Sequence, residues 1–285
     1  MSFASPATLK GAGGFAREEE GLAILSWHPI RRSAYLLLPR DFADGGDGHQ
    51  RICLHAELDA PGVGWVSIDT YIYLLSIAPS DAWAEILFSK PLSAQCHHQH
   101  RPVGVFTTHL SLSHRAREAA VVEIDAWAAR QGSSRFQVLL GDFNAEPHEK
   151  SYRFLVGDST AALRGRVGNW TDASVGRAGL TFPSWRPEKR IDYILFRGAA
   201  ASAGAPGQCQ DAPPENAVAG QSMKCDAPAP ASSPPLRLAH VELLGAEPTE
   251  ESKDWGAKSM LEPGSPIWPS DHLGVYARFD GAEWH

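Results

Sequence analysis

Short apolar runs, each bounded by polar or turn-forming residues, recur along most of the chain. Runs of this length with continuous apolar character are typical of strands buried in a sheet. The pattern predicts strands at Gly21–Leu25, Ser33–Leu38, Arg51–Leu58, Val103–Thr108, Phe136–Leu140, Asp192–Phe196 and Leu273–Phe279. A turn at His28-Pro29 separates the first two, and the Gly- and Asp-rich stretch Asp44–His49 predicts a loop before the third.

Helical periodicity is present in one long segment and in one short segment. Ser113 can cap a helix that runs to about Arg130, whose apolar face is formed by Ala116, Ala120, Ile124 and Trp127. A shorter helix is predicted at Glu146–Val156. Alternation of strands and helices with long apolar runs predicts an α/β fold of the α+β type, with a mixed sheet and helices outside it.

Three segments depart from this pattern. Residues 1–20 are small and polar, so we expect a disordered N-terminal segment without a strand, followed by one domain at 21–285. The stretches at about 66–101 and 198–235 are expected to be insertions outside the core, and the second is rich in Ala, Pro, Gly and Ser. His97, His98 and His100 lie in the first, but adjacent histidines rarely face one centre, so no zinc site is predicted.

Composition narrows the class of protein. A chain of 285 residues with 43% hydrophobic and 21% charged residues fits one globular domain. The net charge of −7 argues against a nonspecific nucleic-acid binder and favours a small phosphoester or a lipid headgroup as substrate. The four cysteines form no close pair, no signal peptide is visible, and no apolar run could span a membrane. We therefore expect a soluble intracellular protein.

The candidate chemistry lies in four short segments at strand ends: Thr107–Leu110, Gly141–Asn144, Arg190–Tyr193 and Ser270–His272. Polar groups at the ends of adjacent strands converge on one edge of a sheet, where sites are commonly built. One Asp-x-Asn triplet is common in turns, but four such segments tied to strand ends are a specific signal. The pattern therefore predicts one site that contains residues of all four.

These residue types suit phosphate-ester cleavage, which needs a cation, a base and an acid. Asp142, Asn144 and Asp271 are hard oxygen donors of the kind that Mg²⁺ or Mn²⁺ selects. His272 is a candidate base, and Asp192 can hold its other ring nitrogen and fix the tautomer. His109 ends a strand and can donate to a phosphate oxygen or to the leaving group.

Each residue also has a structural interpretation. Asp142 and Asn144 can cap the turn before a helix, and Asp192 can be a buried partner of Arg190. A lone His109 is more often an interior histidine than a catalyst, and Asp271-His272 is more often a helix cap or a solvated pair. Together, and in this order, the four segments favour a functional site.

The sequences Gly-Asp-Phe-Asn at 141–144 and Ser-Asp-His at 270–272 resemble the endonuclease/exonuclease/phosphatase superfamily of metal-dependent phosphoesterases. The resemblance covers about Gly21 to Phe279 and implies a four-layer sandwich of two mixed β-sheets flanked by helices. It also implies Asp142 and Asn144 at the attacking water and the metal, Asp271 on the metal, and an Asp192–His272 pair. Trp185 either rims the pocket, as aromatic residues do in related sequences, or is a packing residue.

The resemblance also implies an element that the sequence does not show. Superfamily members begin with a strand ending in Asn and a strand ending in a metal-binding Glu, both before the counterpart of Gly21–Ser26. Only 20 residues precede Gly21, so we expect a domain apparently lacking its first two strands. The prediction is a monomeric magnesium-dependent phosphoesterase that acts on an unidentified phosphoester and is impaired by a missing N-terminal metal ligand. The alternatives are a noncatalytic phosphate-binding or scaffold domain and an incomplete gene model.

Overall fold

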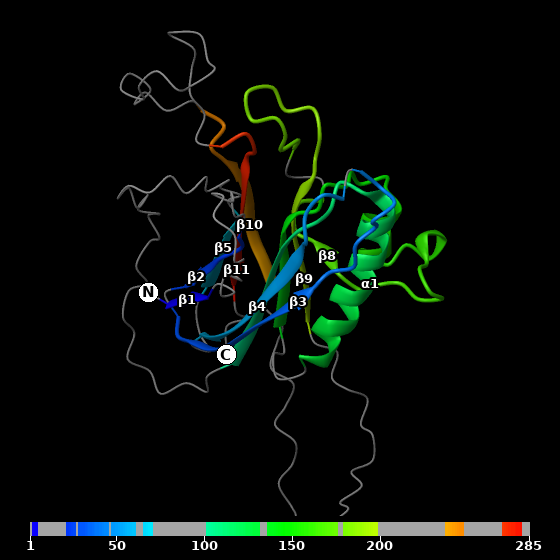
Figure 1. Ribbon diagram of the computed structural model, residues 1–285. Coiled ribbons are helices and arrows are strands. Elements are labelled where there is room, and N and C mark those ends of the chain that lie inside the picture. The colour runs from blue at the N-terminus through cyan, green and yellow to red at the C-terminus, as the bar shows by residue number, and fades with distance from the viewer. Residues whose placement is uncertain are drawn as a thin grey trace, which may run out of the picture.

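Most of the predicted elements lie in the part of the chain that can be described. The computed structural model describes residues 2–4, 21–26, 28–45, 47–60, 65–70, 101–131, 136–175, 179–198, 237–247 and 270–280. Figure 1 shows these residues as a twisted sheet with a long helix on one side and a smaller sheet on the other. The mixed α+β class predicted from the sequence is confirmed.

The large sheet has six strands in the order β3-β4-β6-β7-β9-β8. Neighbouring strands are antiparallel except β6 and β7, which are parallel and are joined through helix α1 (His114–Arg130). This strand–helix–strand unit places the ends of β6 and β7 at the same edge. The six strands are β3 (Ile30–Leu37), β4 (Ile52–Ala60), β6 (Arg101–His109), β7 (Phe136–Asp142), β8 (Thr171–Asp172) and β9 (Asp192–Gly198).

A smaller antiparallel sheet has the order β10-β11-β5, and a short pair, β1-β2, lies beside it in Figure 1. Its central strand, β11, directly follows the predicted site residues Ser270–His272, so this sheet positions the last of the four segments. The remaining strands are β1 (Ser2–Ala4), β2 (Ile24–Ser26), β5 (Trp65–Thr70), β10 (Arg237–Leu244) and β11 (Gly274–Asp280).

The central strand β7 of the large sheet is buried on both faces, which explains its continuous apolar run, whereas the edge strand β3 is largely exposed. In β7, Leu139 packs into the core beneath the helices, while Val138 and Leu140 pack into the core shared with the smaller sheet. Successive side chains of a strand point to opposite faces, so a run of apolar residues fills both cores. In the described residues the layers are therefore helices, large sheet and small sheet. A second helical layer, as in the predicted four-layer sandwich, is not seen there.

Helix α1 begins where the sequence predicts, because the Ser113 hydroxyl accepts a hydrogen bond from the Ala116 N–H. The second helix, α2 (Lys150–Leu155), is shorter than the predicted Glu146–Val156. Its first residues form a turn instead, in which the Glu149 N–H donates to the Glu146 carbonyl and the Glu149 carboxylate accepts from the Glu146 N–H. A single turn of 3-10 helix follows at Ser159–Ala161. None of the helices in the described residues is long and apolar enough to cross a membrane.

Two predicted boundaries are wrong. Ser2–Ala4 pairs with Ile24–Ser26, although no strand was expected within residues 1–20, where three residues are too few to show a period. Trp65–Thr70 pairs with β11 in the smaller sheet, so the first predicted insertion does not begin at residue 66. Residues 71–100, with the histidine cluster, and residues 199–236 lie outside the described residues.

Candidate active site

Three strands of the large sheet meet at one edge, and each carries a predicted site residue there. His109 is paired with Asp142 in the β6–β7 ladder, and Asp142 is paired with Asp192 in the β7–β9 ladder. The three residues therefore lie side by side on neighbouring strands. The Nε2 atom of His109 is 3.3 Å from an Asp142 carboxylate oxygen. The register of the sheet thus brings together three of the four predicted segments.

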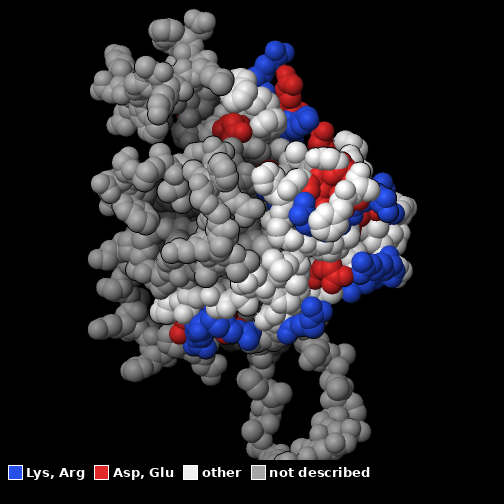
Figure 2. All heavy atoms as spheres, viewed as in Figure 1, with Lys and Arg blue, Asp and Glu red and all other residues white. Residues whose placement is uncertain are grey.

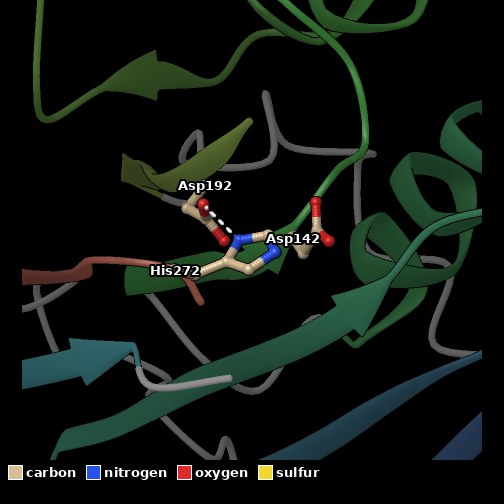
Figure 3. A group of neighbouring side chains, drawn as sticks. All are labelled: Asp142, Asp192 and His272. Atoms are coloured by element: carbon tan, nitrogen blue, oxygen red, sulfur yellow. Dashed lines mark hydrogen bonds and ion pairs between the residues drawn. The ribbon is translucent and has the colours of Figure 1, made fainter. Parts of the chain in front are cut away.

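The fourth segment reaches the same place from the smaller sheet. The Nδ1 atom of His272 lies 2.9 Å from an Asp192 carboxylate oxygen. One potential ligand atom from each of Asp142, Asp192 and His272 lies within 4.8 Å of the other two. Figure 3 shows the imidazole between the two carboxylates, with its second ring nitrogen on the side of Asp142. Asp142 and Asp192 are almost fully buried, whereas His272 is partly exposed.

The turn after β7 holds the Asp142 carboxylate in a fixed place. The Asn144 N–H donates to an Asp142 carboxylate oxygen at 2.7 Å, and the Asn144 side-chain amide donates to the Leu110 carbonyl at 2.9 Å. Asn144 adopts a left-handed conformation, with φ of 47°, which Asn tolerates better than most residues. The Leu110 N–H in turn donates to the Asp142 carbonyl at 2.9 Å. The Asp142 carboxylate therefore accepts a hydrogen bond within its own turn, as the capping interpretation predicts, and the site assignments of Asp142 and Asn144 stay predictions.

Gly141 allows β6 and β7 to come this close. Its φ is 130°, and a Cβ atom built there would lie 1.9 Å from the Thr108 carbonyl oxygen. A side chain at this position would collide with the neighbouring strand, and the backbone conformation is one that only glycine adopts readily. The glycine of the Gly-Asp-Phe-Asn segment thus allows the close pairing that brings Asp142 beside His109.

Asp271 is placed less directly than the other predicted residues. Its carboxylate accepts from the Ser270 hydroxyl at 3.4 Å, and its backbone carbonyl accepts from the Ser184 N–H at 2.8 Å. Asp271 is not in the group of potential ligands formed by Asp142, Asp192 and His272. Its assignment as a metal ligand therefore stays a prediction. The alternative in which Arg190 pairs with Asp192 is wrong, because Arg190 donates to both carboxylate oxygens of Asp172.

Burial and neighbouring charges shift the pKa values of the site residues in different directions. Burial, with the charge of Asp192, raises the pKa of Asp142 to about 7, against the hydrogen bond from Asn144. Burial, with the charge of Arg51, lowers the pKa of His109 to about 3, so this ring is neutral. Burial lowers the pKa of His272, but its hydrogen bond to Asp192 and the nearby carboxylates outweigh it, and the net direction is upward.

The residues at this edge fit a divalent cation. Burial, and then the charge of neighbouring Asp192, disfavour the ionised form of Asp142 and raise its pKa, so further positive charge beside this carboxyl would favour its ionised form. A divalent cation beside Asp142 would supply this charge, and Mg²⁺ and Mn²⁺ prefer carboxylate oxygens. Nδ1 of His272 is already occupied by Asp192. The arrangement fits a cation on the Asp142 side with the histidine beside it.

Sequence reasoning missed residues that support the site. Arg51 and His49 were not singled out, yet both act on His109 electrostatically. A usable signal existed for Arg51, since it precedes β4, whose Cys53 pairs with Thr108 beside His109. From the loop at 181–185 only Trp185 was considered, although Thr181 and Ser184 contact Asp192 and the His272 loop. Trp185 is 57% exposed, which agrees with a half-buried aromatic residue, and its place at the rim of the pocket stays a prediction.

Comparison with known proteins assigns the chain to a family. The sequence pattern of the Endonuclease/Exonuclease/phosphatase family matches residues 4–272. The match spans most of the chain, and the protein therefore belongs to the endonuclease/exonuclease/phosphatase family. No curated protein matches the sequence significantly.

Solved structures with a similar fold share little sequence with this chain. A functionally unknown conserved protein from Enterococcus faecalis V583 has a TM-score of 0.50 and 16% identity, over 99% of this chain and 77% of that one. An endonuclease/exonuclease/phosphatase family protein from Bacteroides thetaiotaomicron has a TM-score of 0.47 and 13% identity, over 90% and 66%. The human Nocturnin catalytic domain with bound sulfate has 0.44 and 15%, over 92% and 64%. This chain spans about two thirds of the last two.

Proposed function

We propose that this chain is the phosphoesterase domain of a divalent-metal-dependent hydrolase. The observation that carries the proposal is the alignment of Asp192, His272 and Asp142 at one sheet edge, with 2.9 Å between the first two. Attack of water on phosphorus needs a general base and a cation. Here a buried carboxylate orients an imidazole that can act as the base, and the second carboxylate beside it is suited to bind the cation. Membership of the family supports the same reaction class.

Each residue has a role in this proposal. Asp192 accepts from Nδ1–H of His272 and so leaves the second ring nitrogen, on the Asp142 side, to take a proton from water. Asp142 and Asn144 position that water, and Asp142, Asn144 and Asp271 hold Mg²⁺ or Mn²⁺. Neutral His109 donates a hydrogen bond to a phosphate oxygen or to the leaving group. The bound cation would neutralise charge that develops on the phosphate.

The substrate class follows from charge only in part. A net charge of −7 favours a small phosphoester or lipid headgroup over extended nucleic acid. Figure 2 shows Lys and Arg side chains interspersed with Asp and Glu on the described surface, without one continuous basic face in that view. The proposed substrate is therefore a compact phosphoester, and the domain is proposed to act as a monomer.

We expect turnover by residues 1–285 to be weak. Mg²⁺ needs several oxygen ligands in near-octahedral geometry. The Glu and Asn that the family resemblance implies would lie before Gly21, and strand β1, Ser2–Ala4, contains neither. Without a further carboxylate the cation is held loosely, which weakens the alignment of water and phosphate. A noncatalytic phosphate-binding domain is the alternative outcome of the same test.

The test is hydrolysis of bis-p-nitrophenyl phosphate with Mg²⁺ or Mn²⁺, before and after removal of the metal with EDTA. Asp142→Asn and His272→Ala should each reduce the rate by at least about 100-fold, the size expected when an acid–base group is lost. Exposed residues away from the site provide matched controls, Asp158→Asn and His240→Ala. Both controls should keep the parent rate.

The outcomes separate the candidate functions. Metal-dependent hydrolysis that is lost in both site variants supports the phosphoesterase. Strong turnover by the parent would show that the cation needs no additional upstream ligand. No turnover at any metal concentration, together with phosphate binding that Asp142→Asn abolishes, would support the noncatalytic domain. Hydrolysis that survives both substitutions would contradict the proposed site.

A further inference from the structure

One short buried segment contacts both members of the Asp192–His272 pair. The Thr181 hydroxyl accepts hydrogen bonds from the N–H groups of Ile191 and Asp192, at 3.2 and 3.3 Å. The Thr181 carbonyl accepts a hydrogen bond from the Leu273 N–H at 2.8 Å. One residue therefore joins the start of β9, which carries Asp192, to the residue that follows His272.

Ser184 and Phe182 extend the same contact along the loop of the smaller sheet. The Ser184 hydroxyl donates to the Ser270 carbonyl at 2.6 Å, and its N–H donates to the Asp271 carbonyl at 2.8 Å. The Phe182 ring packs against the His272 imidazole, with centroids 4.7 Å apart. These contacts hold the His272 ring through Phe182 and the backbone on both sides of it through Asp271 and Leu273.

We infer that Thr181 and Ser184 are positioning residues that fix the His272 imidazole against Asp192, an inference that rests on the proposed function of that pair. Neither residue touches the reacting atoms in this assignment. Asp192 begins β9 of the large sheet, and His272 lies in the loop before β11 of the smaller sheet. Their 2.9 Å contact therefore depends on how this loop is placed relative to the start of β9. Thr181 bonds to both the start of β9 and the His272 loop, and Ser184, three residues further on, bonds to the His272 loop. Both residues are buried, at 1% and 2% exposure.

Two hydroxyl groups make the inference testable, because each can be removed with little change of shape, whereas the other hydrogen bonds to these loops use backbone atoms. Ser184→Ala deletes the donor to Ser270, and Thr181→Val deletes the acceptor for Ile191 and Asp192 with almost no change of shape. Thr181→Ser keeps that acceptor and is the rescue variant. Ser174→Ala is the matched control, since the Ser174 hydroxyl is buried and has no hydrogen-bond partner in the described residues.

The first measurement is the NMR signal of the His272 Nδ1–H proton, which the bond to Asp192 protects from exchange with water. We expect exchange to become at least about ten times faster in Ser184→Ala and Thr181→Val. It should stay within about twofold of the parent in Ser174→Ala and Thr181→Ser. The second measurement is hydrolysis of bis-p-nitrophenyl phosphate, where kcat should fall about 10- to 100-fold while KM changes less than about twofold, as for loss of alignment.

The two readouts separate this inference from the proposed function. A protected His272 signal in the parent that is lost in both deletion variants supports positioning even when the parent hydrolyses nothing, and in that case only the proposed function fails. An unprotected signal in the parent overturns the inference. So does a protected signal that persists in Ser184→Ala and Thr181→Val. If Ser184→Ala does not fold, the Thr181→Val and Thr181→Ser pair decides the question.

Discussion

The two halves of the candidate site are held together in different ways. His109 and Asp142 are neighbours in one sheet, and the backbone bond from Leu110 to Asp142 continues the β6–β7 contact into the turns. Asp192 and His272 are 80 positions apart and come from different sheets, and Ser184 reaches Ser270 across 86 positions. The first half is therefore set by strand register. In the second half the same register places Asp192, but the position of His272 depends on a few tertiary hydrogen bonds.

A buried ion pair reinforces the first half further. Arg117 donates to the carbonyls of Ser111 and Leu112 and to the Glu149 carboxylate, the last at 2.5 Å. It thus links the turn after β6 to the turn after β7. Because several independent contacts hold His109 and Asp142, single losses there should affect stability more than geometry. In the second half, the loss of one hydroxyl should affect geometry more than stability.

The largest effect should come from the backbone of the first half, in Gly141→Ala. The new Cβ would collide with the Thr108 carbonyl, and the φ of 130° is unfavourable for Ala. We expect a loss of more than about 4 kcal/mol of unfolding free energy, or failure to fold, measured by urea denaturation. Gly198→Ala, with nothing within 4 Å of its Cβ, should change stability by less than about 1 kcal/mol. Equal effects of the two substitutions would contradict the close pairing of β6 and β7.

The next largest effect should come from the network between the two halves. Arg190 binds both carboxylate oxygens of buried Asp172, and the Tyr193 hydroxyl lies within 2.8 Å of the carbonyls of Ala145 and Arg190. Arg190→Met leaves the Asp172 charge buried without its partner, which costs about 3–5 kcal/mol in other proteins. Denaturant unfolding measures this loss.

Arg186→Met is the control for that substitution, since Arg186 and its partner Glu188 are exposed. Surface pairs contribute little, so the control should change the unfolding free energy by at most about 1 kcal/mol. A loss in Arg190→Met no larger than in Arg186→Met would contradict a stabilising contribution of the buried Arg190–Asp172 pair.

The difference between the halves also explains what the sequence could predict. The strands that end at His109 and Asp142 have continuous apolar runs, and α1 between them has a clear cap at Ser113, so this unit followed from periodicity. Strand β5 was missed because Trp65–Thr70 pairs with β11, far away in the chain, and no local signal reports that partner. Strand β8, Thr171–Asp172, has too few residues to show the alternation of apolar and polar positions that marks a strand.

The same limit applies within the site. The motif segments indicated His109, Asp142, Asp192 and His272, because residue type and strand ends are visible in the sequence. The contacts of Thr181 and Ser184 were not predicted, since Ser and Thr in a turn are ordinary and their partners lie in distant loops. Tertiary pairing, rather than local pattern, identifies positioning residues.

Acid should lower the unfolding free energy through His55, which lies on β4 beside β6 of the first half. This ring is buried between Phe106 and Trp127, and burial, with the charge of Arg32 and against that of Glu57, lowers its pKa to about 4. The unfolded chain, with a pKa near 6.5, binds this proton more readily than the folded one. Stability from His55 is therefore complete above about pH 6.5 and is lost as the pH falls toward 4, by up to about 3 kcal/mol.

The measurement for His55 is the difference in unfolding free energy between pH 7 and pH 4.5. His55→Phe keeps an aromatic ring against Phe106 and removes the titrating group, so its difference should be smaller by about 2–3 kcal/mol. All other titrating residues are common to both proteins, which isolates the contribution of His55. An identical pH dependence in the two proteins would contradict the buried neutral histidine.

The smallest expected effect on stability is that of Ser113→Ala. It tests the comparison most directly, because Ser113 of the first half can be compared with Ser184 of the second. Ser113→Ala removes the hydroxyl that caps α1 and should cost about 1 kcal/mol of unfolding free energy. His109 and Asp142 should keep their places, since the bond from Leu110 to Asp142 and the Arg117–Glu149 pair remain. The protected N–H signal of His272 should also be unchanged in Ser113→Ala, although Ser184→Ala removes it at a similar cost in stability. Loss of that signal in Ser113→Ala would mean that the two halves are not held independently.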